Sequence, residues 1–166
     1  MILVIVDTKL NEMKKLLFTA ALVLGISQVN AQNYKNALGV VVDLGDGETL
    51  VGPQYKHSFD GRNAGNLQVM FADNITVLGA DYTYNQSFSG TNGLGWYVGV
   101  GPQLSFIDRA YGDKTYFAIR PQVGLEYKIP SAPLAMHFDW KPWWNLTNDS
   151  NFEAGRFSLG FKYVFN

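Results

Sequence analysis

Cysteine is absent from this chain of 166 residues, which excludes disulfide bonds, thiolate catalysis and cysteine-ligated metal sites together. The same absence excludes a lipid-anchored lipoprotein, because no cysteine follows the apolar segment near the N-terminus. A surplus of basic residues is also missing, since the formal net charge is −1 at pH 7. Nucleic-acid-binding domains usually carry such a surplus, so we expect no nucleic-acid partner.

Long apolar runs are equally scarce. After residue 31 no segment approaches the roughly 20 apolar residues that a transmembrane helix needs, which excludes a helical membrane protein. One shorter apolar stretch, Leu16–Ile26, follows Met13-Lys14-Lys15 and precedes Val29-Asn30-Ala31. Basic residues, a short apolar stretch and a small-residue site in this order are typical of a cleaved secretory signal peptide. A retained N-terminal anchor is the alternative.

These features divide the chain into three parts. Residues 1–12 precede the basic residues and are interpreted as a mis-annotated upstream extension, with translation starting at Met13. Residues 13–31 form the predicted signal peptide, and residues 32–166 form one mature domain. Removing residues 1–31 takes away three basic and two acidic residues, which changes the net charge from −1 to −2.

Strict alternation of side chains is the strongest pattern in the mature domain. From Arg156 to Phe165 every second residue, beginning with Phe157, is large and apolar, whereas the positions between them include Arg156 and Lys162. A period of two indicates a β-strand, and an aromatic face opposite a charged face is typical of a membrane barrel with a polar interior. The same pattern predicts eight strands: Asn36–Leu44, Leu50–Phe59, Asn66–Ala72, Thr76–Asn85, Leu94–Phe106, Thr115–Ile129, Leu134–Trp140 and Arg156–Phe165.

The strand count and spacing predict the fold class, an all-β, eight-stranded antiparallel up-and-down transmembrane β-barrel. A tilted membrane strand needs roughly 9–11 residues, and eight strands in the 135 residues from 32 to 166 leave about 17 residues for each strand with its connection. An even number of strands places both termini on one side, which we expect to be the periplasm. Pro53, Pro102 and Pro121 fall on the apolar faces of their strands and predict local bulges, because proline has no N–H to donate.

Charged side chains gather on the predicted inner face. An eight-stranded barrel is just wide enough for side chains to fill, and buried charges are tolerated when they are paired. We therefore predict a closed polar network with a structural role, and a narrow ion path is the alternative. Its members are Asp43, Lys56, Asp81, Arg120, Glu126, His137, Asp139, Lys141, Arg156 and Lys162.

Aromatic residues cluster toward the predicted strand ends. Aromatic girdles at the level of the lipid headgroups are the common explanation for this pattern. A sugar-binding platform at Trp143-Trp144 is the alternative. The residues expected at the membrane interface are Tyr55, Trp96, Trp140, Trp143, Trp144, Tyr163 and Phe165.

Catalytic and cofactor motifs are not predicted. His57 and Ser58 are adjacent in one strand, so their side chains point to opposite faces and His57 cannot activate Ser58. The glycines at 95, 99 and 101 are not followed by a helix, so they do not form a nucleotide-binding motif. We expect no enzymatic activity, no metal and no cofactor. A lipid-A-modifying barrel enzyme is the alternative.

Three segments carry a family resemblance: Gly95–Gly101, Gly124–Lys128 and Asp139-Trp140-Lys141-Pro142. They resemble small outer-membrane β-barrel proteins of Bacteroidetes-type bacteria, and more distantly the chain is similar to the OmpA/OmpX transmembrane barrel. The resemblance covers essentially the whole mature domain and implies eight strands and an outer-membrane location. Such barrels commonly end on an aromatic residue, whereas here Asn166 follows Phe165.

The sequence therefore predicts an integral outer-membrane barrel with a structural or envelope-related role. Its expected partners are outer-membrane lipid and the barrel insertion machinery, which would recognise the C-terminal strand, and we expect a monomer. Two alternatives remain at this stage, a narrow pore for ions or small solutes and a soluble periplasmic lipocalin-like barrel. The soluble barrel would use the same alternation with its two faces exchanged.

The first testable prediction is that the mature protein begins at Gln32. Cleavage is expected after Val29-Asn30-Ala31 because small residues there follow the apolar stretch. Intact-mass analysis of the protein recovered from cell envelopes measures this directly. A mass that includes Met13 would contradict the prediction.

Overall fold

The computed structural model describes residues 34–45, 47–108, 112–147 and 150–166, and every regular element in these residues is a β-strand. The predicted upstream extension, the signal peptide and the cleavage site before Gln32 lie outside the described residues. Among the described residues, no helix is long and apolar enough to cross a membrane. The strands are β1 (Asn36–Leu44), β2 (Thr49–Ser58), β3 (Asn63–Ala72), β4 (Ile75–Ser87), β5 (Leu94–Ile107), β6 (Lys114–Lys128), β7 (Leu134–Trp140), β8 (Trp143–Asn145), β9 (Asn151–Glu153) and β10 (Phe157–Phe165).

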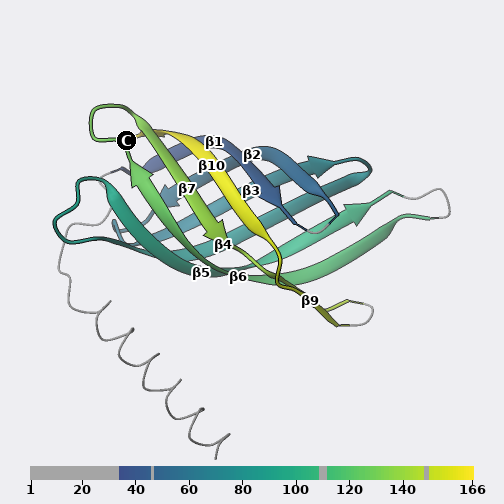
Figure 1. Cartoon of the computed structure of the whole chain (residues 1–166). Coiled ribbons are helices and arrows are strands. Elements are labelled where there is room, and N and C mark those ends of the chain that lie inside the picture. Colours follow the sequence, from purple (N-terminus) through teal and green to yellow (C-terminus); the bar gives the residue numbers. More distant parts are fainter. Residues whose placement is uncertain (1–33, 46, 109–111, 148–149) are drawn as a thin grey trace, which may run out of the picture.

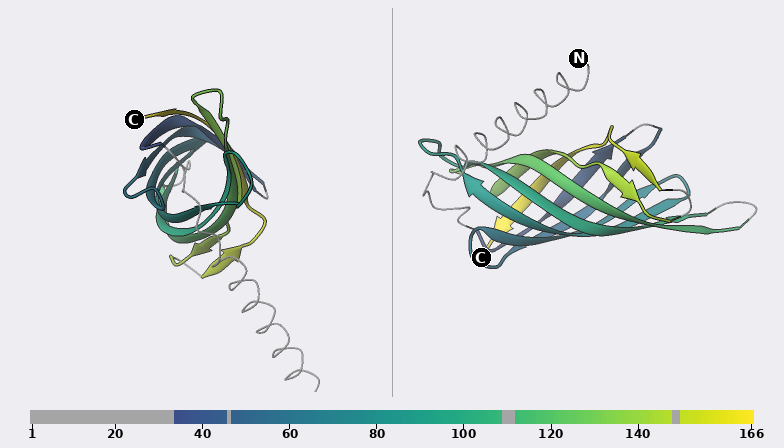
Figure 2. Two further views of the ribbon diagram at one scale, coloured as in Figure 1. Left: turned by 90° about the vertical axis from the view of Figure 1, so that its left-hand side faces the viewer. Right: turned by 90° about the horizontal axis from the view of Figure 1, so that it is seen from below.

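These strands form a closed antiparallel barrel. Its wall has eight positions, which we call staves, each filled by one strand or by two short strands end to end. β1 to β6 pair in chain order, β7 and β8 both pair with β6, and β9 and β10 pair with β8 and β7. β7 with β8 and β9 with β10 are therefore the seventh and eighth staves. Pairing of β1 with β10, from Asn36↔Phe165 to Leu44↔Phe157, closes the ring that Figure 2 shows end-on. The predicted fold class is confirmed.

The staves are strongly tilted, as closure of a barrel requires. The tilt is evident when paired residues are followed round the ring. Leu44 ends β1 at one end of the barrel. Its successive partners across β10, β7, β6, β5 and β4 lead to Asn63, which begins β3 at the other end. β1 begins and β10 ends at one mouth of the barrel, which we call the terminal end. The opposite mouth is the distal end, where β5 and β6 reach beyond the other strands (Figure 1).

The two faces of the barrel wall differ sharply. On β10 the side chain of Phe161 is 57% exposed on the outer face, whereas its strand neighbour Lys162 is buried inside. The same alternation holds along β7, where Phe138 is exposed and His137 and Asp139 are buried. Apolar residues therefore cover the outside and polar residues fill the inside, as the sequence period predicts.

The bulges predicted at the three prolines are wrong. Val51↔Phe71 and Gln54↔Gln68 share one register on either side of Pro53, and Gly79↔Gln103 and Tyr82↔Val100 share one register around Pro102. Pro121 is itself paired with Val100 and Gly101 with Arg120 in an unbroken ladder. Each proline side chain faces outward. The missing N–H removes at most one hydrogen bond from the ladder, and the pairing register does not change.

A bulge occurs instead between β9 and β10. Trp140 pairs with Phe157 and Trp144 pairs with Phe152, so residues 141–143 lie opposite residues 153–156, a segment longer by one residue. The indole Nε1 of Trp140 donates to the Ala154 carbonyl at 2.6 Å and fixes the extra residue. A bulge bends its strand, and the β8–β9 hairpin stands outside the ring in Figure 2. Strand pairing therefore also occurs outside the eight predicted strands, with Trp144↔Phe152 and Asn145↔Asn151.

The second testable prediction concerns the outer face of β10. Phe161→Arg places a cation at the middle of an apolar strand face, where a lipid-facing arginine costs about 2–4 kcal/mol near the bilayer midplane. We expect a much lower folded yield in lipid vesicles than for the control Phe161→Leu. Equal yields for the two variants, measured by gel mobility without heating, would contradict a lipid-facing wall.

Candidate functional site

The interior of the barrel holds every ionisable residue that the sequence predicts there, and none of them is more than 4% exposed. The structure distributes them along the barrel axis in three groups, which we call the Glu126, Asp81–Asp139 and Asp43 groups. Together they contain four carboxylates, five lysine or arginine side chains and one histidine. Charge is thus close to balanced inside the barrel.

The Glu126 group lies toward the terminal end. Lys56 Nζ is 3.0 Å from Glu126 Oε1 and donates to Asn85 Oδ1 at 2.9 Å, while Lys162 Nζ donates to Glu126 Oε2. The Tyr34 hydroxyl donates to Glu126 Oε1 from the segment before β1. Burial and the negative charge of Glu126 raise the pKa of Tyr34, so its hydroxyl keeps the proton that it donates.

Tyr34 is a member of the interior network that the sequence analysis missed. It precedes the first alternating strand, so no period-two pattern marks its direction. It packs with Ala37, Ala135 and Val164 in a small apolar cluster at the terminal mouth. Its ring therefore separates the polar interior from the space outside that mouth.

Asp81 and Asp139 anchor the middle group from opposite sides of the barrel. Arg120 Nη2 donates to both oxygens of Asp81, at 2.9 Å and 2.7 Å. Lys141 Nζ lies between the two carboxylates, 3.7 Å from Asp81 Oδ2 and 3.9 Å from Asp139 Oδ2. Charges taken out of water are stable only when they are paired and hydrogen-bonded in this way.

Asp139 also collects neutral donors. The hydroxyls of Tyr97 and Ser158 both donate to it, the second at 2.6 Å, and His137 Nε2 lies 3.7 Å away. Tyr97 and His137 meet edge to face with ring centres 6.4 Å apart. Ser158 is thus bonded to the Asp139 carboxylate and not to the His137 imidazole.

The Asp43 group lies toward the distal end. Arg156 Nε donates to Asp43 Oδ1 at 2.9 Å, and the guanidinium carbon lies 3.6 Å from the ring centre of Trp143. Trp143 is buried, so its predicted place at the membrane interface is wrong. The residue follows the inward-facing Lys141 by two positions, which puts its side chain on the inner face.

The other predicted interface residues lie on the outer face. Trp140, Trp144, Tyr163 and Phe165 are exposed there. Tyr55 and Trp96 are half-buried by neighbours on the same face: the Tyr55 hydroxyl donates to Asn36 Oδ1 at 2.8 Å, and Trp96 packs beside Tyr84.

Glycines on the inner face make room for the charged side chains. A Cβ at Gly79 would lie 2.0 Å from Arg120 Nη2, and a Cβ at Gly160 would lie 2.1 Å from His137 Cε1. Atoms cannot approach so closely, so these large side chains occupy space that any other residue would fill. The glycines of the strand interiors are therefore part of the site.

Little free volume remains around the Glu126 group. The space enclosed around Glu126, His137 and Lys162 is about 10 Å³, and a cavity needs about 10–15 Å³ to hold a single water molecule. Within the described residues, no three or more His, Asp and Glu side chains are arranged to hold a metal ion.

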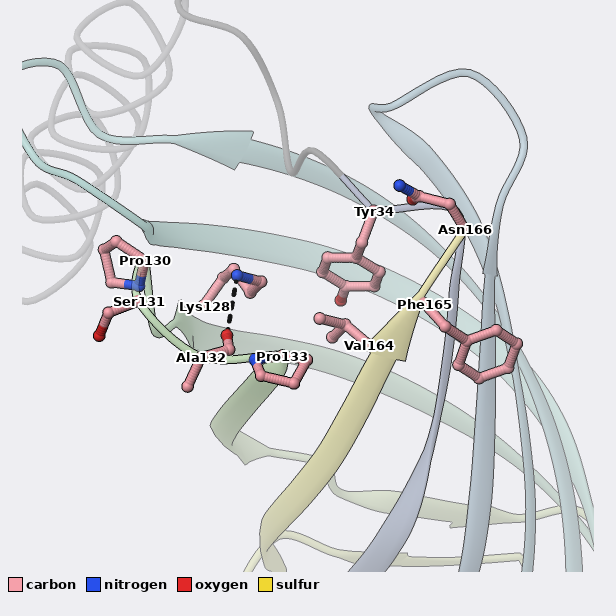
Figure 3. Close-up of a pocket in the computed structure, with 9 residues that line it drawn as sticks. All are labelled: Tyr34, Lys128, Pro130, Ser131, Ala132, Pro133, Val164, Phe165 and Asn166. Carbon is pink, nitrogen blue, oxygen red and sulfur yellow. Dashed lines mark hydrogen bonds between the residues drawn. The ribbon is translucent and has the colours of Figure 1, made fainter.

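A larger pocket of about 350 Å³ opens at the terminal mouth (Figure 3). Tyr34 and Val164 form its inner side, and the turn from Pro130 to Pro133 forms its outer side. Lys128 Nζ is held within it by the carbonyls of Ile129 and Ala132, at 2.8 Å and 3.1 Å. The pocket is a vestibule outside Tyr34, because the tyrosine ring lies between it and Glu126.

The third testable prediction concerns the pairing of Asp81 with Arg120. Asp81→Ala leaves the Arg120 guanidinium buried without its carboxylate, and breaking a buried pair costs about 3–5 kcal/mol. We expect this loss in the free energy of unfolding, measured by denaturant titration in detergent. The double variant Asp81→Ala/Arg120→Met removes the orphaned charge and should recover much of the loss. A double variant as unstable as the single one would contradict the pairing.

Comparison with known proteins gives a fold and no family. No family model and no curated protein matches the chain. Among solved structures, the chain is similar to the N-terminal β-barrel domain of Pseudomonas aeruginosa OprF, with a TM-score of 0.65, 15% identity, and coverage of 78% of this chain and 96% of that one. Neisserial surface protein A also matches, with a TM-score of 0.46, 15% identity, and coverage of 80% and 96%. The chain therefore has the eight-stranded barrel fold of the OprF domain.

Proposed function

We propose that this protein is an integral outer-membrane β-barrel with a plugged polar interior and a structural or envelope-related role. The observation that carries the proposal is the inverted distribution of side chains. Large apolar residues such as Phe138 and Phe161 are exposed all round the wall, whereas lysines, arginines and carboxylates are buried inside it. An apolar exterior around a polar interior suits a protein whose surroundings are lipid.

The same distribution disfavours a soluble lipocalin-like barrel. A soluble barrel that held an apolar ligand would turn its aromatic face inward and its charges to water. Here Arg120 and Lys141 are no more than 1% exposed, whereas Leu67 and Tyr163 are more than half exposed. An exposed apolar surface of this extent would promote aggregation in water.

A structural role follows from the filled interior. Ion pairs join Lys56 to Glu126 and Arg120 to Asp81 inside the lumen, and the space left around Glu126 would hold about one water molecule. A narrow pore is the second candidate, because the lumen is lined by charges. Conduction would require these pairs to separate inside a medium where separated charges are costly.

The absence of enzymatic activity is part of the proposal. Modification of lipid A would need a nucleophile and a base near the distal mouth, which would be the extracellular one. The interior histidine, His137, lies beside Asp139 within the wall, and Ser158 is bonded to that same carboxylate. His57 stays on the outer face with Asn36 and Phe59, away from the buried Ser58.

The membrane setting defines the expected partners. We propose that the terminal end faces the periplasm, that lipid covers the apolar wall, and that the insertion machinery recognises β10 with its outward-facing Phe161, Tyr163 and Phe165. The resemblance of Gly95–Gly101 and Asp139–Pro142 supports a place among small barrels of Bacteroidetes-type bacteria. A monomer suffices, because the barrel closes on itself through β1 and β10.

Membrane location is tested by fractionation of cells that make the full chain. We expect the protein in the outer-membrane fraction, extracted by detergent and not by salt, with a gel mobility that changes on heating. Recovery in the soluble fraction would overturn the proposal.

The fourth testable prediction separates the plugged barrel from the pore. In planar bilayers the wild-type protein should show no large, steady single-channel steps, because side chains fill the lumen. Glu126→Ala removes the carboxylate shared by Lys56 and Lys162 and should raise ion leakage. Phe161→Leu, on the outer face, is the control and should leave ion leakage unchanged. Large wild-type steps would favour the pore.

A further inference from the structure

The side chains of two adjacent tryptophans at the distal end lie on opposite faces of the barrel wall. Trp143 is 8% exposed and belongs to the interior, whereas Trp144 is 50% exposed on the outer face. Both sit on β8, where alternation sends successive side chains to opposite faces. The role of Trp143 therefore differs from that of every other tryptophan in the chain.

Trp143 packs in an apolar cluster across the distal part of the lumen. The cluster draws side chains from five different strands, so it spans the barrel rather than lining one wall. Its members are Val41, Leu50, Met70, Val77 and Trp143, with Ala72 and Ile75 packed against it. We call this cluster the distal cap.

Arg156 holds the tryptophan in place from one side. Its guanidinium stacks on the indole at 3.6 Å and is itself paired with Asp43. A cation over an aromatic face is attractive and gains strength when both groups are shielded from water. A Cβ at Gly45 would lie 2.4 Å from Arg156 Nη1, so this glycine makes room for the clamp.

We propose that the distal cap is a barrier to water in its own right, with Trp143 as its stopper, separate from the ion-pair groups behind it. The inference rests on the proposed closed barrel and deepens it by naming the residue that seals one mouth. Ion pairs attract water, whereas an apolar plug excludes it. The cap thus keeps Asp43, Asp81 and Asp139 dry, which strengthens their pairing.

Trp143 sits on a segment that is attached to the barrel differently from the strands that carry the rest of the cap. β8 pairs with β6 at only two positions, Ala118↔Asn145 and Ile119↔Trp144. The bulge at Ala154 then breaks the register between β9 and β10. The stopper therefore depends on local packing around Trp143 more than on a continuous ladder.

The absence of native cysteine allows a direct test. Ser158→Cys is a near-isosteric replacement in the interior, at a position 1% exposed and bonded to Asp139. Its reaction with a water-soluble methanethiosulfonate reagent reports the entry of water and small solutes. The measurement uses the full-length folded barrel in detergent, with gel mobility before heating as the check on folding.

We expect the thiol to react slowly in the wild-type background and at least about tenfold faster with Trp143→Ala, which corresponds to a barrier lower by about 1.4 kcal/mol. Trp144→Ala is the matched control and should leave the rate unchanged. Trp143→Phe should restore protection, because it keeps an aromatic ring beneath Arg156. If Trp143→Ala does not fold, Leu50→Ala opens the same cap from β2 and should give the same increase.

Each remaining outcome counts against the cap. Equal rates for Trp143→Ala and Trp144→Ala would show that Trp143 does not seal the mouth. Fast labelling in the wild-type background would show that the cap leaks, even where bilayer recordings find no conduction. Single-channel steps from the wild-type protein speak instead to the proposed plugged barrel, so the two proposals fail through different measurements.

Discussion

Closure of eight strands into one ring is the constraint on which the rest of this structure depends. The pleat sends every second side chain inward, and the ring leaves only enough width for those side chains to meet. A lysine or carboxylate on the inner face therefore reaches a partner across the lumen instead of water. The Glu126 carboxylate shows the result, because it receives Lys56 from β2 and Lys162 from β10 at once.

Sequence periodicity predicts the eight long strands and the direction of most of their side chains, because both follow from local backbone geometry, but it misses the short strands β8 and β9. It could not assign the ion pairs. Which charges share a level depends on the registers of all strands between them, and these registers are set by tilt and closure. Arg156 and Asp43 are neighbours in space through the β1–β10 pairing, although they lie 113 residues apart in the chain.

The errors of the sequence analysis share a physical cause, which is that tertiary context decides between equivalent local patterns. An outward-facing proline removes a hydrogen bond from the ladder but does not change the pairing register, so β2 has no bulge at Pro53. A bulge forms instead in the segment opposite Pro142, at Ala154, where the Trp140 indole donates to the backbone carbonyl. Trp143 resembles a girdle residue because it is adjacent to Trp144. It follows the inward-facing Lys141 by two positions, however, so strand alternation places its side chain inside the barrel.

The axial order of the interior gives the ion pairs their stability. Apolar side chains cluster at both mouths, Tyr34 with Ala37 and Val164 at one and Trp143 with its cluster at the other. The charged groups between them are thus shielded along the axis as well as by the wall. Low local polarity strengthens a paired charge and penalises an unpaired one, so the apolar ends and the polar middle stabilise each other.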